Sequence, residues 1–177
     1  RDVTTGSKKK VWWKCPEADD HEWESTISDR NRGNGCPFCS NKAVTKLNCL
    51  ATLSPELAKE WHPTKNRNLT SYDVTPGSNE NVWWKCPKGN DHEWKTSISH
   101  RSSGTGCPMC ANQIVVKSNC LGTLNPELAK EWHPTKNGNL TPDYVTAGSN
   151  KKVWWKCPKG DDHEWQASIN DRNRGRG

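Results

Sequence analysis

The pattern of apolar and polar positions predicts a short β-hairpin in the best preserved segment of the chain. Residues 82–85 and 93–98 are rich in aromatic and β-branched side chains, which is typical of strands. Residues 75–79, Thr-Pro-Gly-Ser-Asn, have the chemistry of a turn. Because neighbouring side chains on a strand point to opposite faces, Trp83 and Trp84 cannot both enter one core.

A short helix is predicted upstream of this hairpin, from Ser54 to about Trp61. Ser54 is a good N-cap, Pro55 suits the first helical position, and Pro63 ends the helix. Leu57 and Trp61, four residues apart, give it a single apolar face. A helix of barely two turns is unstable alone in water, so we expect it to dock on another element.

The same pattern recurs every 71 residues along the chain. Val-Trp-Trp-Lys-Cys-Pro begins at Val11, Val82 and Val153. Residues 49–106 and 120–177 align with 41 identities in 58 positions. Such similarity at a fixed period indicates a tandem repeat of one structural unit.

The composition does not fit a domain with one large aliphatic core. Of the 177 residues, 31% are hydrophobic and 26% are charged, and the mean hydropathy is −1.05. Eleven tryptophans argue against a disordered chain. No apolar stretch reaches the roughly 18 residues of a membrane helix, and the N-terminal residues lack a hydrophobic signal segment. We therefore expect a soluble protein of an intracellular, reducing compartment.

The cysteines and histidines predict structural zinc sites. Nine cysteines are an odd number, which disfavours a disulfide scaffold. The spacing Cys-x5-His-x14-Cys-x2-Cys occurs twice and supplies the soft ligands of a closed tetrahedral Zn²⁺ site. A redox Cys-x-x-Cys pair would need a βαβ context, and a catalytic zinc would need an open position. The predicted ligands are Cys15, His21, Cys36 and Cys39 in the first site and Cys86, His92, Cys107 and Cys110 in the second.

We therefore expect two Zn²⁺ ions per chain and a fold whose stability depends on them. The predicted fold class is small zinc-stabilised α+β repeats, each a short helix plus a β-hairpin zinc ribbon, in a tandem array. Cys157 and His163 form an incomplete site, because no Cys-Pro-x-Cys follows them. The predicted units are a partial repeat over residues 1–48 with a complete metal site, a complete repeat over 49–119, and a truncated repeat over 120–177.

Cys49 and Cys120 keep the period of the repeat but lie ten residues after the last ligand of each site. A further site there would have too few ligands, so we expect both to be small buried residues. The formal net charge of +6 falls to about +4 when two Cys₃His zinc sites each contribute −1. This mildly basic charge permits nucleic acid as a partner without requiring it.

Two groups of residues are candidates for contacts with a partner. Several arginines lie in a segment before Cys-Pro-x-Cys that is rich in Gly, Ser and Asn and is therefore predicted to be a loop. A basic loop beside a zinc turn suits phosphate contact, although a solvated loop explains the arginines equally well. One interpretation of the paired tryptophans is that both members form a small aromatic cluster with Trp94 and Trp61, across the hairpin, the helix and the adjoining repeat. The other is that one tryptophan of the pair is exposed and stacks on a base or fills the pocket of a protein partner. These candidates are Arg30, Arg32, Arg101, Trp12, Trp83 and Trp154.

The motifs Val-Trp-Trp-Lys-Cys-Pro, His-Glu-Trp, Gly-Cys-Pro-x-Cys and Leu-x-Pro-Glu-Leu-Ala-Lys-Glu-Trp-His-Pro together resemble the probable zinc-ribbon repeat family. That family is of uncharacterised function, occurs in tandem arrays, and is similar to treble-clef fingers. Some members are joined to nuclease domains, which implies a nucleic-acid role by association. The chain departs from the family pattern where Asp19-Asp20, Asn90-Asp91 and Asp161-Asp162 lengthen the turn between the first two ligands, and no nuclease domain is present.

These observations favour a non-catalytic tandem zinc module that binds DNA or structured RNA through basic loops and exposed tryptophan. The alternative is an architectural subunit that binds other proteins in a large assembly. We do not expect an enzyme, because no nucleophile-base pair, carboxylate pair or phosphate-binding loop recurs in the repeats. We expect neither membrane insertion nor a small-molecule substrate.

Overall fold

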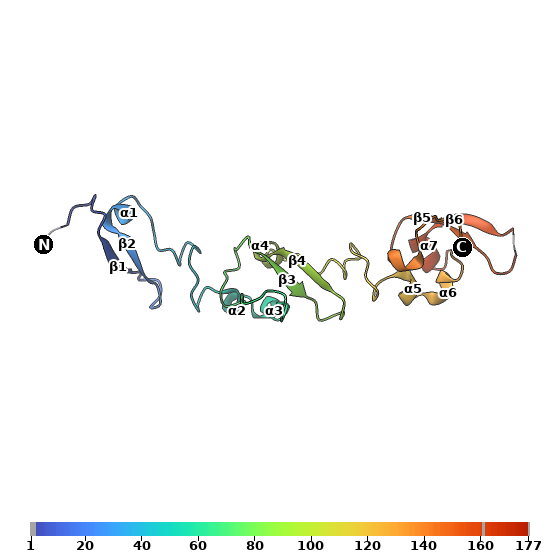
Figure 1. The fold of residues 1–177 in the computed structure, drawn as a ribbon, viewed down its shortest axis with the longest axis horizontal. Coiled ribbons are helices and arrows are strands. Elements are labelled where there is room, and N and C mark those ends of the chain that lie inside the picture. The colour runs from blue at the N-terminus through green and yellow to red at the C-terminus, as the bar shows by residue number, and fades with distance from the viewer. Residues whose placement is uncertain (1–2, 161, 177) are drawn as a thin grey trace. The chain divides into compact units, whose positions relative to one another are not determined.

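The computed structural model describes residues 3–160 and 162–176, and its described part contains three antiparallel β-hairpins (Figure 1). Asp161, part of one of the acidic pairs, lies outside the described residues. The strands are β1 (Lys10–Lys14) with β2 (Glu22–Thr26), β3 (Asn81–Lys85) with β4 (Glu93–Ser97), and β5 (Lys152–Lys156) with β6 (Glu164–Ser168). The two strands predicted for the middle hairpin are therefore confirmed within one residue at each end.

Both outer hairpins have the same register, which places tryptophans opposite each other. Trp13 pairs with Trp23 in the first hairpin, and Trp155 pairs with Trp165 in the third. The tryptophan before Trp155 lies on the other face of its strand, and the burial follows this alternation. Trp155 is fully buried, whereas Trp154 is half-buried. The prediction that the paired tryptophans have different environments is confirmed.

A one-turn helix directly follows each hairpin, where the sequence had indicated a loop. These helices are α1 (Ile27–Asn31), α4 (Ile98–Ser102) and α7 (Ile169–Asn173). Thr26, Ser97 and Ser168 are their N-caps, and each side-chain oxygen accepts a hydrogen bond from the backbone N–H three residues later. The loop prediction was wrong. It relied on the glycines that follow these helices and did not use the N-cap residues that precede them.

Two one-turn helices precede the middle hairpin and two precede the third, and the helix predicted from Ser54 corresponds to the second of the first pair. They are α2 (Leu50–Leu53) with α3 (Pro55–Ala58), and α5 (Leu121–Leu124) with α6 (Pro126–Ala129). Ser54 separates the first pair with φ −140° and ψ 64°, because the ring of a following proline disfavours the helical conformation. The third copy also has a 3₁₀ turn, η1 (Pro142–Tyr144).

The third copy has a small apolar core that lies around its helix pair and hairpin. Trp155 is completely buried at the core, and the ring of Trp132 meets it edge-on with centroids 5.4 Å apart. Trp132 Nε1 donates to the carbonyl of Leu140 at 3.0 Å, so its polar edge is satisfied. The buried members of this core are Leu121, Leu128, Val145, Ala147, Val153, Trp155 and Ile169.

Candidate metal centre

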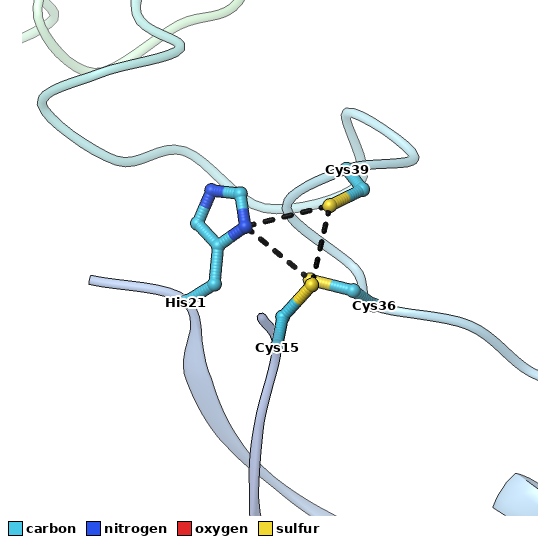
Figure 2. A group of neighbouring side chains, drawn as sticks. All are labelled: Cys15, His21, Cys36 and Cys39. Carbon is cyan, nitrogen blue, oxygen red and sulfur yellow. Dashed lines mark hydrogen bonds between the residues drawn. The ribbon is translucent and has the colours of Figure 1, made fainter. Parts of the chain in front are cut away.

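The first predicted ligand set comes together at the tip of the β1–β2 hairpin. Cys15 follows β1 and His21 precedes β2, and the Cys15 N–H donates to the His21 carbonyl at 3.0 Å. Figure 2 shows His21 Nδ1 facing the sulfurs of Cys36 and Cys39, at 3.7 and 3.4 Å, while Cys15 Sγ lies 3.6 Å from Cys39 Sγ. All four ligand atoms lie within 4.8 Å of one another.

The two later cysteines of this site are held by a tight turn. Ser40 N donates to the Cys36 carbonyl at 3.2 Å, and Asn41 N donates to the Phe38 carbonyl at 3.0 Å. Asn41 closes the turn with a φ of 55°, a left-handed conformation that asparagine tolerates better than most residues. The proline between the cysteines fixes φ at the start of the turn, so both sulfurs point to the same side.

The second ligand set repeats this geometry on the β3–β4 hairpin. His92 Nδ1 lies 3.6 Å from Cys107 Sγ and 3.4 Å from Cys110 Sγ. Cys86 Sγ lies 3.7 Å from Cys110 Sγ, and the Cys86 N–H donates to the His92 carbonyl at 3.0 Å. These four ligand atoms also lie within 4.8 Å of one another.

Both clusters fit a tetrahedral zinc ion. With Zn–S bonds of about 2.3 Å and a Zn–N bond of about 2.0 Å, a tetrahedron has S–S edges of about 3.7 Å and N–S edges of about 3.5 Å. The sulfur pairs here lie 3.6 and 3.7 Å apart, and the nitrogen-sulfur pairs lie 3.4 to 3.7 Å apart. All the cysteines are free, so no disulfide competes for these thiols. Four protein ligands close the coordination shell, which is typical of structural zinc.

The raised pKa values of two cysteines show that a bound ion must displace the protons of their thiols. The hydrogen bond to the Cys15 thiol is the main cause that raises the pKa of Cys39 to about 12. Burial, followed by the thiols of Cys86 and Cys107, raises the pKa of Cys110 to about 12. Thiols with such pKa values stay protonated at neutral pH unless a metal ion stabilises the thiolates.

The incomplete third set has the same hairpin tip. The Cys157 N–H donates to the His163 carbonyl at 2.9 Å, as in the other copies. The His163 side chain is 59% exposed, compared with 8% for His92. Among the described residues, Cys157 and His163 belong to no cluster of four ligands. The expected pair of complete Cys₃His clusters is therefore confirmed for the described part of the chain.

The histidine of the second site has a hydrogen-bonded residue behind it that sequence reasoning missed. His92 Nε2 lies 3.0 Å from Ser118 Oγ, and Ser118 donates from its hydroxyl and its backbone N–H to the two carboxylate oxygens of Asp91, at 2.6 and 2.9 Å. The two Ser118 hydrogen bonds lower the pKa of the Asp91 carboxyl. The sequence had marked Asp91 only as part of a lengthened turn between two ligands, and no spacing rule indicated Ser118, 26 residues beyond His92.

Cys49 and Cys120 lie outside both clusters, as the sequence indicated. They are 0% and 1% exposed. Cys120 Sγ donates to the Lys117 carbonyl at 3.3 Å and lies 3.3 Å from Thr123 Oγ1.

We expect Cys120→Ser to retain two zinc ions per chain. A serine hydroxyl can donate to the Lys117 carbonyl in place of the thiol, so the free energy of unfolding should fall by only about 1 kcal/mol. Elemental analysis and thermal denaturation measure these two quantities. Cys110→Ser is the matched control and should lose one zinc ion, whereas loss of a zinc ion from Cys120→Ser would place this cysteine in a metal site.

The arginines predicted to contact a partner have different environments. Arg101 lies on α4, is 7% exposed, and donates from a guanidinium nitrogen to Glu60 Oε2 at 2.6 Å. Arg30 lies on α1 with its guanidinium 5.1 Å from the ring centroid of Trp13. Arg32 is exposed at the C-cap of α1. The loop placement was therefore wrong for Arg30 and Arg101, because these residues pack the helix against its neighbours.

The three candidate tryptophans also differ in exposure. Trp12 is 70% exposed. Trp83 and Trp154 are half-buried, and a lysine nitrogen lies 4.5 Å from the ring centroid of each, from Lys65 and Lys136 respectively. In the two later copies, the outward-facing tryptophan is thus part of a basic surface.

Comparison with known proteins agrees with the metal sites. A family model described as a probable treble clef zinc finger domain matches residues 1–42, 57–113 and 128–177, and the first two segments contain all eight ligands. No curated protein gives a significant match. In the described part of the chain, every helix is too short or too polar to cross a membrane. The predicted repeat boundaries differ from the matched segments and stay a prediction. The chain belongs to the family of probable treble clef zinc finger domains.

Proposed function

We propose that this chain is a non-catalytic zinc module that binds nucleic acid through a basic groove beside the outward-facing tryptophan. In the middle copy a polar groove of about 500 Å³ is lined by Trp83 and by three basic side chains, Lys65, Arg67 and Lys95. Glu80 is the acidic residue of its lining, so the groove has an excess of positive charge. Phosphate groups are the natural ligands of such a surface.

The side chain of Asn66 anchors the segment that carries two of the basic residues of the groove. Asn66 donates from its amide to the Trp83 carbonyl at 2.9 Å and accepts from the Trp83 N–H at 2.8 Å. This pair of hydrogen bonds fixes Lys65 and Arg67, on either side of Asn66, against strand β3. Arg67 has a φ of 54°, a left-handed conformation that costs about 1 kcal/mol for a residue other than glycine.

The observation that carries the proposal is that the third copy keeps both the tryptophan, Trp154, and a set of basic residues in the equivalent segments. Asn137 holds Trp154 through the same two hydrogen bonds, and Lys136 lies over its ring. Gly138 and Gln166 replace Arg67 and Lys95, which removes two positive charges. Lys151 and Lys152 replace Glu80 and Asn81, which removes one negative charge and adds two positive ones, so the third copy is more positive by one charge over these four positions. Both copies thus combine a tryptophan with several basic residues, although the basic positions differ.

This combination is typical of surfaces that bind single-stranded nucleic acid. Basic side chains contact the phosphates, and an aromatic face accepts a stacked base without a strong sequence preference. A protein partner is the alternative, and the 70% exposure of Trp12 favours it for the first copy.

We expect Arg67→Gly combined with Lys95→Gln to weaken binding of a single-stranded oligonucleotide roughly tenfold. Removing two phosphate contacts should also reduce the slope of log K against log salt by about 1.4. These replacements are the residues of the third copy, so the fold and the zinc content should not change. Fluorescence anisotropy at several salt concentrations measures both effects.

Lys59→Gln is the matched control, because Lys59 is exposed on the same copy and pairs with Glu56 outside the groove. This control should leave the slope unchanged. If the double variant binds with the same affinity and the same slope as the original chain, the groove is not a phosphate site and the protein-binding alternative is favoured.

A further inference from the structure

The two zinc sites differ in the hydrogen-bond partner of Nε2, the histidine nitrogen that faces away from the sulfurs. With Nδ1 of His92 directed at the sulfurs, Nε2 carries the proton and donates to Ser118 Oγ at 3.0 Å. The Ser118 hydroxyl donates in turn to Asp91 Oδ1 at 2.6 Å, and the Ser118 N–H holds Asp91 Oδ2 at 2.9 Å. His92 is therefore linked to a carboxylate through one hydroxyl.

The first site lacks this hydroxyl. Leu47, which is 55% exposed, occupies the position that Ser118 has in the second site. The surrounding turn is the same, because Asn48 accepts from the Thr45 N–H at 2.7 Å just as Asn119 accepts from the Val116 N–H at 2.8 Å. The difference is therefore one of side chain and not of backbone.

The acidic residue is present in both sites, but it does not reach the histidine by itself. His21 Nε2 lies 3.8 Å from Asp20 Oδ1, and His92 Nε2 lies 3.9 Å from Asp91 Oδ1, and both distances are too long for a hydrogen bond. The two histidines are buried to a similar extent, because 7% of the surface of the whole His21 residue and 6% of that of His92 is exposed. The hydroxyl is therefore what completes the link in the second site.

A partner for the second nitrogen of a ligating imidazole has a known physical effect. It fixes the tautomer and the ring orientation and makes the ligating nitrogen more basic, and removing it costs about 10-fold to 100-fold in metal affinity. We propose that Ser118, held by Asp91, is a positioning residue that makes the second zinc site tighter than the first. The first site then releases its zinc first, so the chain has a state with one ion, held by Cys86, His92, Cys107 and Cys110. This inference does not depend on the proposed binding of nucleic acid.

The test is a chelator titration of the zinc-loaded chain, followed by NMR signals from each hairpin tip. We expect the first site to empty at a free-zinc concentration about 10-fold to 100-fold higher than the second. Ser118→Ala should lower the affinity of the second site about tenfold, and Ser118→Thr, which keeps the hydroxyl, should restore it. Ser102→Ala, at an exposed serine of α4, should change neither constant.

Placing a serine at position 47 of the first site tests whether the hydroxyl positions the histidine, as distinct from a general loss of stability. Leu47→Ser should raise the affinity of the first site, because Asp20 is already in place to accept from the new hydroxyl. The two sites also differ at Phe38 and Met109, and this variant leaves both unchanged. In the original chain, His92 Nε2–H should exchange slowly with solvent, and Ser118→Ala should abolish this protection while zinc is still bound. Equal affinities of the two original sites, or no gain in Leu47→Ser, would overturn the proposal.

Discussion

Replacing Cys107 by serine is expected to remove one of the two zinc ions and to disorder the tip of the β3–β4 hairpin. A serine oxygen is a poor substitute for a thiolate, and the remaining three ligands leave the tetrahedron open. Structural zinc contributes about 10–16 kcal/mol of binding free energy in small zinc fingers. Its loss therefore costs more free energy than the packing of nearby side chains can supply. Native mass spectrometry should show one zinc ion per chain.

The NMR signals of the two hairpin tips show which site is lost. Signals around His92 should broaden or shift to unfolded positions in Cys107→Ser, whereas those around His21 should stay unchanged, because the two clusters share no ligand. A chain that keeps two zinc ions after this substitution would show that Cys107 is not a ligand.

Replacing Trp155 by alanine is expected to unfold the third copy. Trp155 is completely buried in a core of a few apolar side chains, and removing a buried aromatic ring costs about 3–5 kcal/mol. In the described residues this copy has no complete set of four ligands, so bound zinc cannot offset the loss. Urea denaturation, followed by the methyl NMR signals of Val145 and Ile169, should show a large decrease in the free energy of unfolding.

Trp154→Ala is the matched control for this substitution. Trp154 is half-buried, and the ammonium group of Lys136 lies over its ring, an interaction worth about 0.5–1 kcal/mol. The control should therefore unfold at nearly the same urea concentration as the original chain. Equal effects of the two substitutions would mean that the core does not depend on Trp155.

The metal sites and the hairpins are predictable from the sequence because their rules are local. The spacing of cysteine and histidine nearly determines which side chains can share a tetrahedral ion. The pair Trp154-Trp155 follows from the two-residue period of a strand, so one ring is buried and the other is not. Asp91 was noted because Asn90-Asp91 lengthens the turn between two ligands, which is also a local feature of the sequence.

The features that could not be predicted depend on contacts between distant residues. Arg101 pairs with Glu60, 41 residues earlier, and no local pattern distinguishes this buried arginine from an exposed one. Ser118 contacts His92 because the chain turns back after the last zinc cysteine. The helix predicted from Ser54 corresponds to α3, whose N-cap is Ser54, whereas α2 was not predicted because Cys49 at its N-cap makes no side-chain capping hydrogen bond.

The most direct test of the account is X-ray absorption at the zinc edge of the fully loaded chain. Two Cys₃His sites predict an average shell of three sulfurs at about 2.3 Å and one nitrogen at about 2.0 Å for each zinc ion. A shell of four sulfurs at both ions would require two of Cys49, Cys120 and Cys157 to replace the histidines. A shell dominated by nitrogen or oxygen would remove the thiolates as ligands. Either result would contradict the assignment of both metal centres.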